Sequence, residues 1–459
     1  SIATEIKDIL SQGPIPGLAG GEELSSSSGE TFDVLDPGSG EKLAEVHNLQ
    51  PSDVDRAVEL AGKAFENSQW ANLPVNERCV YLHRLADEVE NRKPLISHLE
   101  SMDCGKILGQ AEDDVQNFID TMRYFADLAQ NTQLRTVLAV KGHEAAYARH
   151  PWGVCGSIVP WNFPFLLCGW GIAPALAAGN TVVVKPAEDT PLTTLYLARM
   201  VKEIGFPDGV VNVVPGLGGV TGAALSANSK LSRMSFTGSP DVGRLVAAEC
   251  GRNLVPVKLE LGGKGAAVVF DDVDVPEAAQ KLVEAITFHT GQVCCDATRW
   301  LVQKPVYDEF VNEVSERMQK VVIGYPSDEG SAMGPVVSEK QKSRVLGYLE
   351  KGIGEGAEVI LEGGAAEVEG RPDGYYVKPA LLAGSLDNVA AREEVFGPVA
   401  YLAPFDSEAE GLAKANDTPY GLANSVWSSD LSRCRRVAES FVAGNGWINS
   451  HNVVVHGVP

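Results

Sequence analysis

The chain has 459 residues, which is too long for one hydrophobic core, so two or more domains are expected. Its hydrophobic fraction of 44% and charged fraction of 22% are typical of a folded globular protein and exclude a disordered or fibrous chain. The formal net charge of −23 argues against nucleic acid and membrane surfaces as partners, because both attract basic proteins.

The first third of the chain is predicted to be mainly helical and to end in a hairpin. Residues 51–129 show helical spacing with few breakers, chiefly Pro74 and Pro94. Residues 134–148 then change to a strand-like pattern on either side of Lys141-Gly142. This change indicates a long β-hairpin.

The region from 153 to 270 alternates between strand-like and helical segments. Short β-branched or apolar runs lie at 181–184, 210–214 and 231–236, and a glycine-rich turn lies at 216–219. One of the intervening helices is expected to begin at Thr190-Pro191 and to stop at Gly205. The alternation predicts a parallel, doubly wound sheet that binds ligands at the carboxyl ends of its strands.

A second alternation follows, from a predicted helix at 276–290 through strand-like runs at 299–302, 358–361 and 399–402. It predicts a second α/β domain. The expected fold class is therefore α/β, with two doubly wound, Rossmann-like domains and a β-hairpin arm.

The sequence predicts neither a membrane span nor a metal site. The most apolar stretch, 163–178, contains prolines and falls short of the ~20 residues that a spanning helix needs, so we interpret it as a buried helix. The eight cysteines lack the spacing of a disulfide framework or a zinc site. Together with the absence of a signal-peptide pattern, they favour a reducing compartment, and the cytoplasm is expected.

Cys294 is the strongest candidate for a nucleophile. It follows the stop of a helix at Gly291 and therefore lies on a loop, where a thiol can be exposed. A thiolate is intrinsically nucleophilic and suits attack on a carbonyl carbon. The alternative is a buried structural cysteine, which is common in proteins.

Two further polar residues stand in unusual surroundings. Glu260 ends an apolar strand and precedes two glycines, so partial burial of its carboxyl would favour a general base; the alternative is a salt bridge with Lys258 or Lys264. Asn162 lies between Trp161 and Phe163 at the start of the buried helix. Its amide suits donation to an oxyanion, and the alternative is a structural cap.

Six segments in order carry a resemblance to the aldehyde dehydrogenase superfamily over nearly the whole chain. The separation of 34 residues between Glu260 and Cys294 is that of the hydrolytic, non-acylating members of the family. The matching segments are Pro160-Trp-Asn-Phe-Pro164, Lys185-Pro-Ala-Glu188, Phe236-Thr-Gly-Ser239, Glu260-Leu-Gly-Gly-Lys264, Gly291-Gln-Val-Cys294 and Glu394-Val-Phe-Gly-Pro398.

The resemblance implies a reaction and the roles of three residues. Cys294 is expected to attack an aldehyde, Asn162 and the Cys294 backbone N–H to hold the oxyanion, and Glu260 to activate the water that hydrolyses the thioester. Cys295 is not the expected nucleophile, because the family motif gives that role to the residue two after Gln292.

The resemblance also implies NAD as the cofactor, although the GxGxxG fingerprint is incomplete because Thr221 stands at its third glycine position. Lys185 and Glu188 are expected to hold the adenosine ribose, and a carboxylate there favours NAD over NADP. Gly238 and Ser239 open a helix toward the pyrophosphate. The full set of expected cofactor-binding residues is Ile158, Pro160, Trp161, Lys185, Glu188, Phe236, Gly238, Ser239, Leu261, Gln341, Glu394 and Phe396.

The substrate is expected to be a small-molecule aldehyde, in a tunnel lined by Phe163, Trp170 and Phe288. By resemblance these rings could hold a cationic substrate such as betaine aldehyde through cation–π contacts, or form an apolar wall for a general aliphatic aldehyde. Three alternatives stay open: a CoA-acylating semialdehyde dehydrogenase, a catalytically silent structural relative, and a hydrolase that pairs Cys294 with His289.

By resemblance the chain comprises an NAD-binding domain (1–128 and 150–261), an oligomerisation hairpin (129–149) and a catalytic domain (262–445), with 446–459 returning toward the NAD-binding domain. A homodimer or homotetramer is expected. In the family a further tail follows, which supplies part of the tunnel and a strand that pairs with a partner's hairpin, so an additional tail is expected after Pro459.

Overall fold

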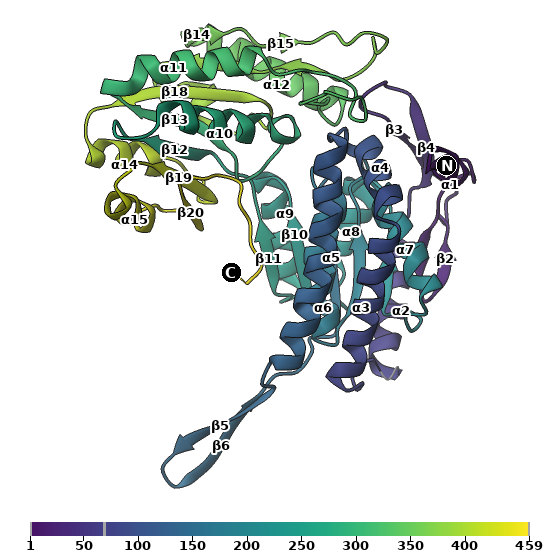
Figure 1. Ribbon diagram of the computed structural model, residues 1–459. Coiled ribbons are helices and arrows are strands. Elements are labelled where there is room, and N and C mark those ends of the chain that lie inside the picture. Colours follow the sequence, from purple (N-terminus) through teal and green to yellow (C-terminus); the bar gives the residue numbers. More distant parts are fainter. Residues whose placement is uncertain (1, 68–69, 458–459) are drawn as a thin grey trace. The chain divides into compact units, whose positions relative to one another are not determined.

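The computed structural model describes residues 2–67 and 70–457 and divides into two compact units (Figure 1). The first unit comprises Ser1–Leu35, Glu41–Cys104 and Leu108–Glu260. The second comprises Asp36–Gly40, Gly105–Ile107 and Leu261–Pro459. The two short early segments of the second unit, 36–40 and 105–107, were not anticipated from the sequence.

The first unit contains a sheet, a separate two-stranded pair, a hairpin and a set of helices. Its elements are α1 (Ile2–Leu10), β1 (Gly17–Ala19), β2 (Glu22–Leu24), β3 (Thr31–Leu35), β4 (Lys42–His47), α2 (Pro51–Asn67), α3 (Val75–Asn91), α4 (Lys93–Cys104), α5 (Leu108–Asn131), β5 (Arg135–Val140), β6 (His143–Ala148), β7 (Val154–Ile158), α6 (Pro164–Ala177), β8 (Thr181–Lys185), α7 (Leu192–Glu203), β9 (Val211–Val213), the π-helix η1 (Gly218–Gly222), α8 (Ala223–Ala227), β10 (Arg233–Thr237), α9 (Pro240–Arg252) and β11 (Val257–Glu260).

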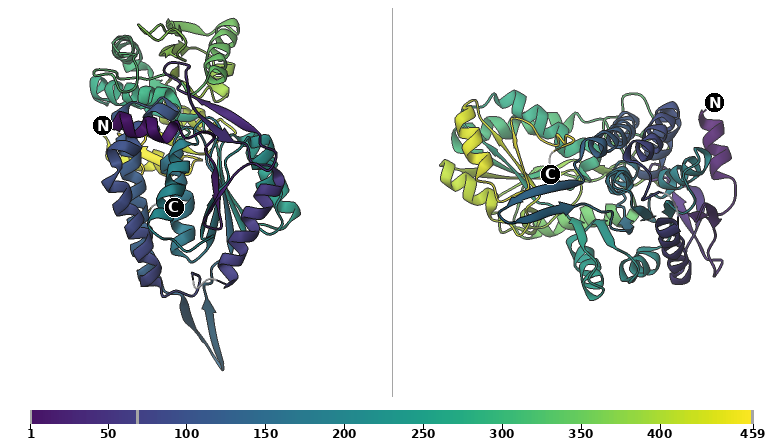
Figure 2. Two further views of the ribbon diagram at one scale, coloured as in Figure 1. Left: turned by 90° about the vertical axis from the view of Figure 1, so that its right-hand side faces the viewer. Right: turned by 90° about the horizontal axis from the view of Figure 1, so that it is seen from below.

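Within the described residues, the sheet of the first unit has seven strands in the order β11-β10-β7-β8-β9-β1-β2. The strands from β11 to β9 run parallel, and β1 and β2 add an antiparallel edge. Figure 2 shows helices on both faces of this sheet. Because helices cover both faces, the central strands are continuously apolar. Residues 182–184 of β8, for example, are all buried.

Helix α7 begins later than the sequence predicted. Thr190 is not its N-cap, because the helix starts at Leu192. The Leu192 N–H donates at 2.8 Å to Oδ2 of Asp103, a buried residue of α4. A carboxylate from a distant helix thus satisfies the first turn, and the local Thr-Pro signal does not mark the start.

The predicted β-hairpin is present. Strands β5 and β6 pair from Arg135↔Ala148 to Val140↔His143, with Lys141-Gly142 at the turn. The hairpin projects away from the rest of the first unit (Figures 1 and 2). An isolated hairpin is marginal in water, and this one leaves apolar residues exposed.

The second unit is a second α/β layer structure. Its elements are β12 (Gly265–Val269), α10 (Val275–Thr287), the 3₁₀ turn η2 (Phe288–Gly291), β13 (Ala297–Gln303), α11 (Lys304–Gln319), α12 (Glu339–Gly354), β14 (Glu358–Leu361), β15 (Gly364–Ala365), β16 (Val377–Lys378), β17 (Ala380–Ala383), α13 (Val389–Arg392), β18 (Val399–Phe405), α14 (Glu408–Asn416), β19 (Ala423–Trp427), α15 (Leu431–Glu439) and β20 (Asn445–Ile448).

Its sheet has the order β14-β17-β18-β13-β12-β19-β20 in the described part of the chain, parallel except for β14. Alternate residues of β12 belong to different cores: Ala267 and Val269 pack with α10 and α11, whereas Ala266 and Val268 pack with α14 and α15. Because successive side chains of a strand point to opposite faces, helices cover both sides, as the doubly wound prediction requires.

The domain boundaries stay a prediction, and the compact units divide the chain at different residues. The division falls after Glu260, and the predicted end of the catalytic domain at 445 lies at the start of β20, which pairs with β19 in the second sheet. Residues 446–457 are grouped with the second unit. A return of this segment toward the NAD-binding domain stays a prediction.

Candidate active site

In the first unit, the carboxyl ends of the parallel strands gather several of the predicted residues. Ile158 of β7 lies opposite Lys185 of β8 and Phe236 of β10, and Thr237 of β10 lies opposite Glu260 of β11. The register therefore places these strand ends at one edge of the sheet. This is the edge at which a doubly wound sheet binds its ligand.

Lys185 and Glu188 form a tight pair beyond β8. The Lys185 side chain is 2% exposed, and its Nζ donates to the Pro186 carbonyl at 2.9 Å and to Glu188 Oε2 at 3.2 Å. Burial lowers the pKa of Lys185, while Glu188 opposes this shift. Burial works against the charge of Glu188, but Lys185 and the Gly218 N–H hold its pKa below the ordinary value.

The start of α9 offers backbone donors at the same edge. Ser239 caps the helix by accepting the Val242 N–H at 3.3 Å, and Pro240 occupies the first turn. A Cβ at Gly238 would lie 2.6 Å from the Phe236 ring, so the ring would have to shift to admit a side chain there. An uncrowded helix N-terminus stabilises a nearby phosphate.

These residues fit a dinucleotide. Gly218 and Gly222 leave open the space beside the pair, since an added Cβ would lie 3.4 Å from Glu188 Oε1 at the first and 3.4 Å from Lys185 Cδ at the second. A carboxylate and an ammonium suit ribose hydroxyls, and a helix N-terminus suits a pyrophosphate.

Asn162 lies in the loop between β7 and α6. It is 4% exposed, which agrees with an amide that must be hydrogen-bonded inside the protein. Pro160, Trp161 and Phe163 around it are partly buried. Trp170, on α6, donates its indole N–H to Asn117 of α5 at 2.8 Å, which fixes the orientation of that ring.

Glu260 is more open than the sequence analysis anticipated. Its side chain is 44% exposed and pairs with Lys258 at 3.0 Å, the salt bridge that had been kept as an alternative. Lys264, the other partner considered, is buried in the second unit and donates its ammonium to the Ala390 carbonyl at 2.8 Å.

In the second unit, the corresponding residues precede the strands. Cys294 comes before β13, and Glu394 and Phe396 come before β18. The register Ala380↔Val399 and Gly265↔Ala297 shows that these amino ends share one edge of the sheet. The second unit therefore presents the opposite strand edge from the first.

A left-handed turn precedes Cys294. His289, Thr290 and Gly291 have φ values of 45°, 57° and 70°, so α10 ends abruptly, a few residues before the predicted stop. Any side chain at Gly291 would collide with the Gly397 carbonyl. Buried Gln292 closes the turn by accepting the Val337 N–H at 2.9 Å and donating to the His289 carbonyl at 3.0 Å. The loop that carries Cys294 is thus fixed on its N-terminal side by Gly291 and Gln292.

Cys294 and Cys295 are partly exposed, whereas the other cysteines are buried. The Cys295 side chain donates to Cys294, and this bond lowers the pKa of the Cys294 thiol although burial opposes it. The same bond, together with burial, raises the pKa of Cys295. A low-pKa, accessible thiol is the form in which cysteine reacts as a nucleophile.

Glu394 and Gln341 are tied to neighbouring backbone. The Glu394 Oε1 atom accepts the Gly263 N–H at 3.0 Å, and a side chain at Gly262 would collide with this carboxyl. Burial raises the pKa of Glu394. Gln341 donates to the carbonyl of Phe396 at 2.6 Å, whose φ is 62°. Leu261 and Phe288, the remaining predicted residues of this unit, are partly buried.

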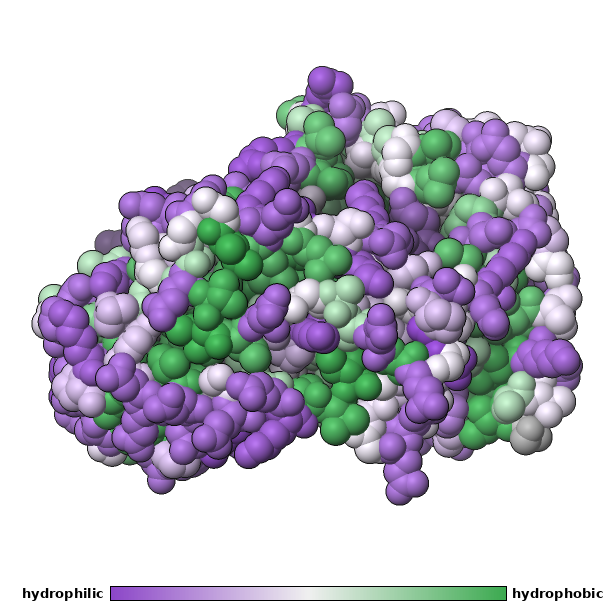
Figure 3. Space-filling view, turned by 90° about the horizontal axis from the view of Figure 1, so that it is seen from above, coloured by the Kyte–Doolittle hydropathy of each residue, from purple (hydrophilic) through white to green (hydrophobic). Residues whose placement is uncertain are grey.

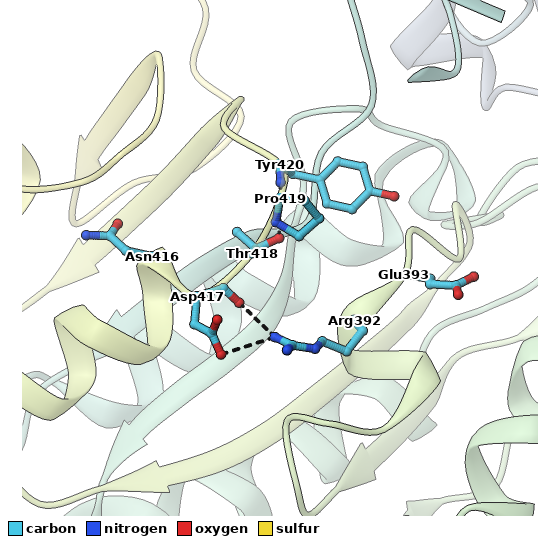
Figure 4. A pocket seen from close by; sticks show the side chains of 7 residues that line it. All are labelled: Arg392, Glu393, Asn416, Asp417, Thr418, Pro419 and Tyr420. Carbon is cyan, nitrogen blue, oxygen red and sulfur yellow. Dashed lines mark hydrogen bonds and ion pairs between the residues drawn. The ribbon is translucent and has the colours of Figure 1, made fainter. Parts of the chain in front are cut away.

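A separate pocket of about 460 Å³ is lined by residues that are close to Glu394 in the sequence (Figure 4). Arg392 and Asp417 point toward each other across it and form an ion pair at 3.1 Å. None of the predicted site residues lines it, although Glu393 precedes Glu394. Its lining residues are Arg392, Glu393, Asn416, Asp417, Thr418, Pro419 and Tyr420.

Sequence reasoning missed several residues around the nucleophile. Gln292 was read only as a landmark of the motif, yet its side chain is wholly buried and bonded to two backbone groups. His451 was not considered, yet it contacts the backbone of Cys295 at 2.8 Å from 156 residues away. No local signal in the sequence marks such a contact.

Seen from above, hydrophilic side chains cover much of the surface, with hydrophobic patches among them (Figure 3). No helix in the described residues is long and apolar enough to cross a membrane. Across the same residues, no group of three or more histidine, cysteine, aspartate or glutamate side chains is arranged to hold a metal ion.

Two doubly wound α/β units, a strand edge that fits a dinucleotide and an activated cysteine are features of a dehydrogenase that works through a cysteine. Residues 24–459 match the model of the aldehyde dehydrogenase family. The chain is 41% identical over 432 residues to the aldehyde dehydrogenase, cytosolic 1, of Rattus norvegicus, which covers 93% of this chain and 85% of that protein.

Two solved structures are similar over almost the whole chain. Betaine aldehyde dehydrogenase of Staphylococcus aureus, in complex with NAD+, has a TM-score of 0.96 at 31% identity and covers 99% of this chain and 90% of its own. The NAD+ complex of aldehyde dehydrogenase from Bacillus cereus has a TM-score of 0.96 at 36% identity and covers 99% and 92%.

The chain belongs to the aldehyde dehydrogenase family. The predicted fold class, two Rossmann-like α/β domains, is confirmed by these structures. The predicted enzyme class and cofactor, an aldehyde dehydrogenase that uses NAD, are confirmed at the level of the family.

Proposed function

We propose that this enzyme oxidises a small aldehyde to its carboxylic acid through a thioester on Cys294, with water as the final acceptor. The observation that carries the proposal is the Cys294 thiol, whose pKa is lowered by Cys295 on a loop fixed by Gly291 and Gln292. Such a thiolate attacks the aldehyde carbon and forms a thiohemiacetal.

Asn162 and Glu260 supply the other two roles. The Asn162 amide and the Cys294 backbone N–H donate to the oxyanion, a contribution that is typically worth ~3 kcal/mol. Glu260 takes a proton from water, which attacks the thioester carbon and releases the acid and the Cys294 thiolate. Its exposed side chain supports access to water, and the ion pair with Lys258 must open for the carboxylate to act.

When bound, NAD would supply the acceptor for the hydride of the thiohemiacetal carbon. In the first unit, Lys185 and Glu188 would hold its ribose, Gly238 and Ser239 its pyrophosphate, and Ile158, Pro160, Trp161 and Phe236 would line its site. In the second unit, Glu394 would hold the nicotinamide ribose, with Leu261, Gln341 and Phe396 beside it. The fixed Glu394 carboxylate and the strand register support these roles.

The substrate is a small aldehyde in a site lined by Phe163, Trp170 and Phe288. Aromatic rings accept either a cationic or an apolar substrate, so the choice lies between betaine aldehyde and a neutral aliphatic aldehyde. Because one of the similar structures is a betaine aldehyde dehydrogenase, betaine aldehyde is the first substrate to test.

The test is NADH formation, followed by its ultraviolet absorbance, with betaine aldehyde and a series of neutral aliphatic aldehydes. Wild type is compared with Cys294→Ala and, as a matched control, with Cys434→Ala, a buried cysteine of α15. We expect NADH from wild type and the control without added CoA, and no NADH from Cys294→Ala.

Two outcomes would contradict the proposal. NADH that forms only when CoA is added would assign the enzyme to the acylating type. No NADH from any aldehyde, in a folded full-length protein that binds NAD, would favour a catalytically silent relative.

We also propose that the enzyme is a cytoplasmic homodimer or homotetramer. The name of the rat relative supports the location, and the exposed apolar residues of the β5–β6 hairpin support assembly. Cell fractionation tests the first, and a solution molecular mass tests the second.

A further inference from the structure

His451 lies in the turn after β20 and makes two hydrogen bonds with its ring. Its Nε2 atom is 2.8 Å from the carbonyl oxygen of Cys295, and its Nδ1 atom is 2.9 Å from the hydroxyl of Ser425 on β19. The ring also packs edge-on against Trp447, with the centroids 4.6 Å apart. The side chain is therefore fixed on three sides.

The partners define the protonation of the ring. A carbonyl oxygen only accepts, so Nε2 must carry the proton. Burial lowers the pKa of His451 to about 4, so the ring is neutral near pH 7 and Nδ1 is an acceptor. Ser425 must then donate its hydroxyl proton to Nδ1, while its oxygen accepts the indole N–H of buried Trp427 at 2.9 Å.

The result is a directed chain of hydrogen bonds. It runs from the Trp427 indole to the Ser425 hydroxyl, then to the His451 ring, and ends on the carbonyl of Cys295. Trp427 and Ser425 belong to a buried strand of the sheet. The loop of Cys294 and Cys295 is thus connected to a buried strand of the second sheet.

The neighbouring Asn452 holds the side chain of the same cysteine. Its Oδ1 atom lies 3.5 Å from the Cys295 sulfur, as the alternative acceptor for the single thiol proton that Cys295 donates to Cys294. Asn452 has a φ of 57° and Asn449 a φ of 50°, an uncommon backbone that local contacts must stabilise. Segment 449–452 therefore grips Cys295 at both its carbonyl and its sulfur.

Cys295 is in turn the main partner of the nucleophile. Its side chain and its backbone N–H both donate to the Cys294 sulfur and favour the thiolate. Rotation of the Cys295 residue would turn both donors away from that sulfur. Whatever fixes Cys295 therefore sets the reactivity of Cys294.

We propose that His451 is a positioning residue for the nucleophile: through Ser425 and Trp427 it anchors the Cys295 carbonyl and aims the two Cys295 donors at the Cys294 sulfur. This role rests on the proposed function of Cys294 as the nucleophile. It deepens that function, because it links the reactivity of the thiol to a histidine that never touches the substrate carbon.

Three other charged or titratable groups act on the same loop. Burial raises the pKa of Asp296, which follows Cys295, and favours its neutral form. Burial also lowers the pKa of Lys264 to about 7, and the carboxyl of Glu394 opposes ionisation of Cys294. A pH profile of Cys294 therefore contains their contributions, so variants must be compared with wild type across the whole profile.

The experiment measures the rate at which iodoacetamide alkylates Cys294 as a function of pH, in the full chain without NAD or aldehyde. Tandem mass spectrometry assigns the label to Cys294 or Cys295, and Cys294→Ala gives the blank. The variants are His451→Phe, which keeps a ring against Trp447, and His451→Gln, whose amide can still donate to the carbonyl.

We expect His451→Phe to slow alkylation of Cys294 near pH 7 by about fivefold, the effect of losing one hydrogen bond. Its profile should shift to higher pH, with the thermal unfolding midpoint close to that of wild type. His451→Gln should restore most of the rate. Ser425→Ala, which removes the link to Trp427, should lie between them if His451→Phe fails to fold.

The control is Ser450→Ala. Ser450 precedes His451, and its hydroxyl donates only to the nearby Ile448 carbonyl at 3.2 Å, so the profile should match wild type. An unshifted profile in both His451→Phe and Ser425→Ala would overturn the positioning role. Loss of thermal stability without a shift would assign His451 a structural role only.

The alkylation profile tests the positioning role of His451 independently of the proposed function. Alkylation needs neither NAD nor an aldehyde, so a shifted profile supports the positioning role even if the enzyme forms no NADH. Normal NADH formation with an unshifted profile would instead leave the proposed reaction intact and remove His451 from it.

Discussion

Among single residues, the Glu188 carboxylate is held in place by hydrogen bonds and is also the group proposed to favour NAD over NADP. It accepts from Lys185 and from the Gly218 N–H, so it is both a fixed anion and a group within reach of solvent, with a side chain 37% exposed. A fixed carboxylate accepts ribose hydroxyls and repels the additional phosphate of NADP. Preference for NAD should therefore depend on its charge.

Replacing Glu188 with Gln should lower the ratio of kcat/KM for NAD over NADP by about tenfold, since a charged hydrogen bond is lost together with the repulsion. Steady-state kinetics with both cofactors measures this ratio. Glu22→Gln, which removes an exposed carboxylate of β2, serves as the control. An unchanged ratio in Glu188→Gln would separate this residue from cofactor choice.

The lowered pKa of His451 predicts how stability depends on pH. The folded pKa is about 4 and the ordinary value is 6.5, so between these pH values the unfolded chain binds more protons than the folded one. Stability from this residue is complete above about pH 6.5 and is lost as the pH falls toward 4, a loss on the order of 2 kcal/mol by pH 5.

Thermal unfolding between pH 7 and pH 5 checks this sign. The midpoint of wild type should fall further over this range than that of His451→Gln, which has no titrating ring. His143→Gln, at the exposed end of the hairpin, should behave as wild type does. An equal fall in all three proteins would contradict the predicted linkage.

The positions of individual site residues could be predicted from the sequence, because the short motifs that contain them also mark the ends of strands. Lys185 and Glu260 could be placed at strand ends from the apolar runs before them, and both stand there in the register. The contacts between residues far apart in the sequence could not be predicted. The contact of His451 with Cys295 spans 156 residues, and only tertiary packing creates it.

Among the elements, the turn between α10 and β13 is tightly constrained. Gly291 combines a φ of 70° with direct packing on Gly397, whereas Gly356, at the end of α12, has a φ of 91° and open space around it. Replacing Gly356 therefore tests backbone strain alone, whereas replacing Gly291 tests strain together with a steric clash.

Gly291→Ala should reduce the alkylation rate of Cys294 by more than about tenfold, because the loop must move away from Gly397 to admit a methyl group. Gly356→Ala should cost only about 1 kcal/mol of stability and leave that rate unchanged. Rates with iodoacetamide and unfolding midpoints measure both. If both variants slowed alkylation of Cys294 equally, backbone strain and not the clash with Gly397 would explain the effect.

Helix boundaries were the weaker part of the sequence prediction. The start of α7 was assigned to a Thr190 cap, but the buried carboxyl of Asp103 takes that role from 89 residues away. Local capping signals are only one way of satisfying a first turn. Where another element supplies the acceptor, the residues near the helix end carry no trace of it.

For the whole molecule, the β5–β6 hairpin determines the expected assembly. It exposes Val137, Leu138 and Tyr147, and a projecting two-stranded edge offers unpaired backbone groups to another chain. Val137 is 64% exposed and lies next to exposed Leu138 on this projecting edge.

Val137→Asp should therefore shift the protein toward a smaller species, because a charge would be buried against the partner. Light scattering after size-exclusion chromatography gives the mass. Glu144→Gln, a change at an exposed position of the same hairpin, should retain the mass of wild type. A wild type that is already monomeric would contradict the proposed assembly.

The early segment 36–40 has a consequence for how the protein can be made. Asp36 accepts the Tyr325 hydroxyl at 2.9 Å, and the Gly38 carbonyl accepts that of Tyr376 at 3.0 Å, so the second unit uses residues that are synthesised long before the rest of it. A chain that begins at Leu261 would lack these residues and form an incomplete unit. Such a chain should recruit chaperones or proteases unless a peptide containing these residues is supplied separately.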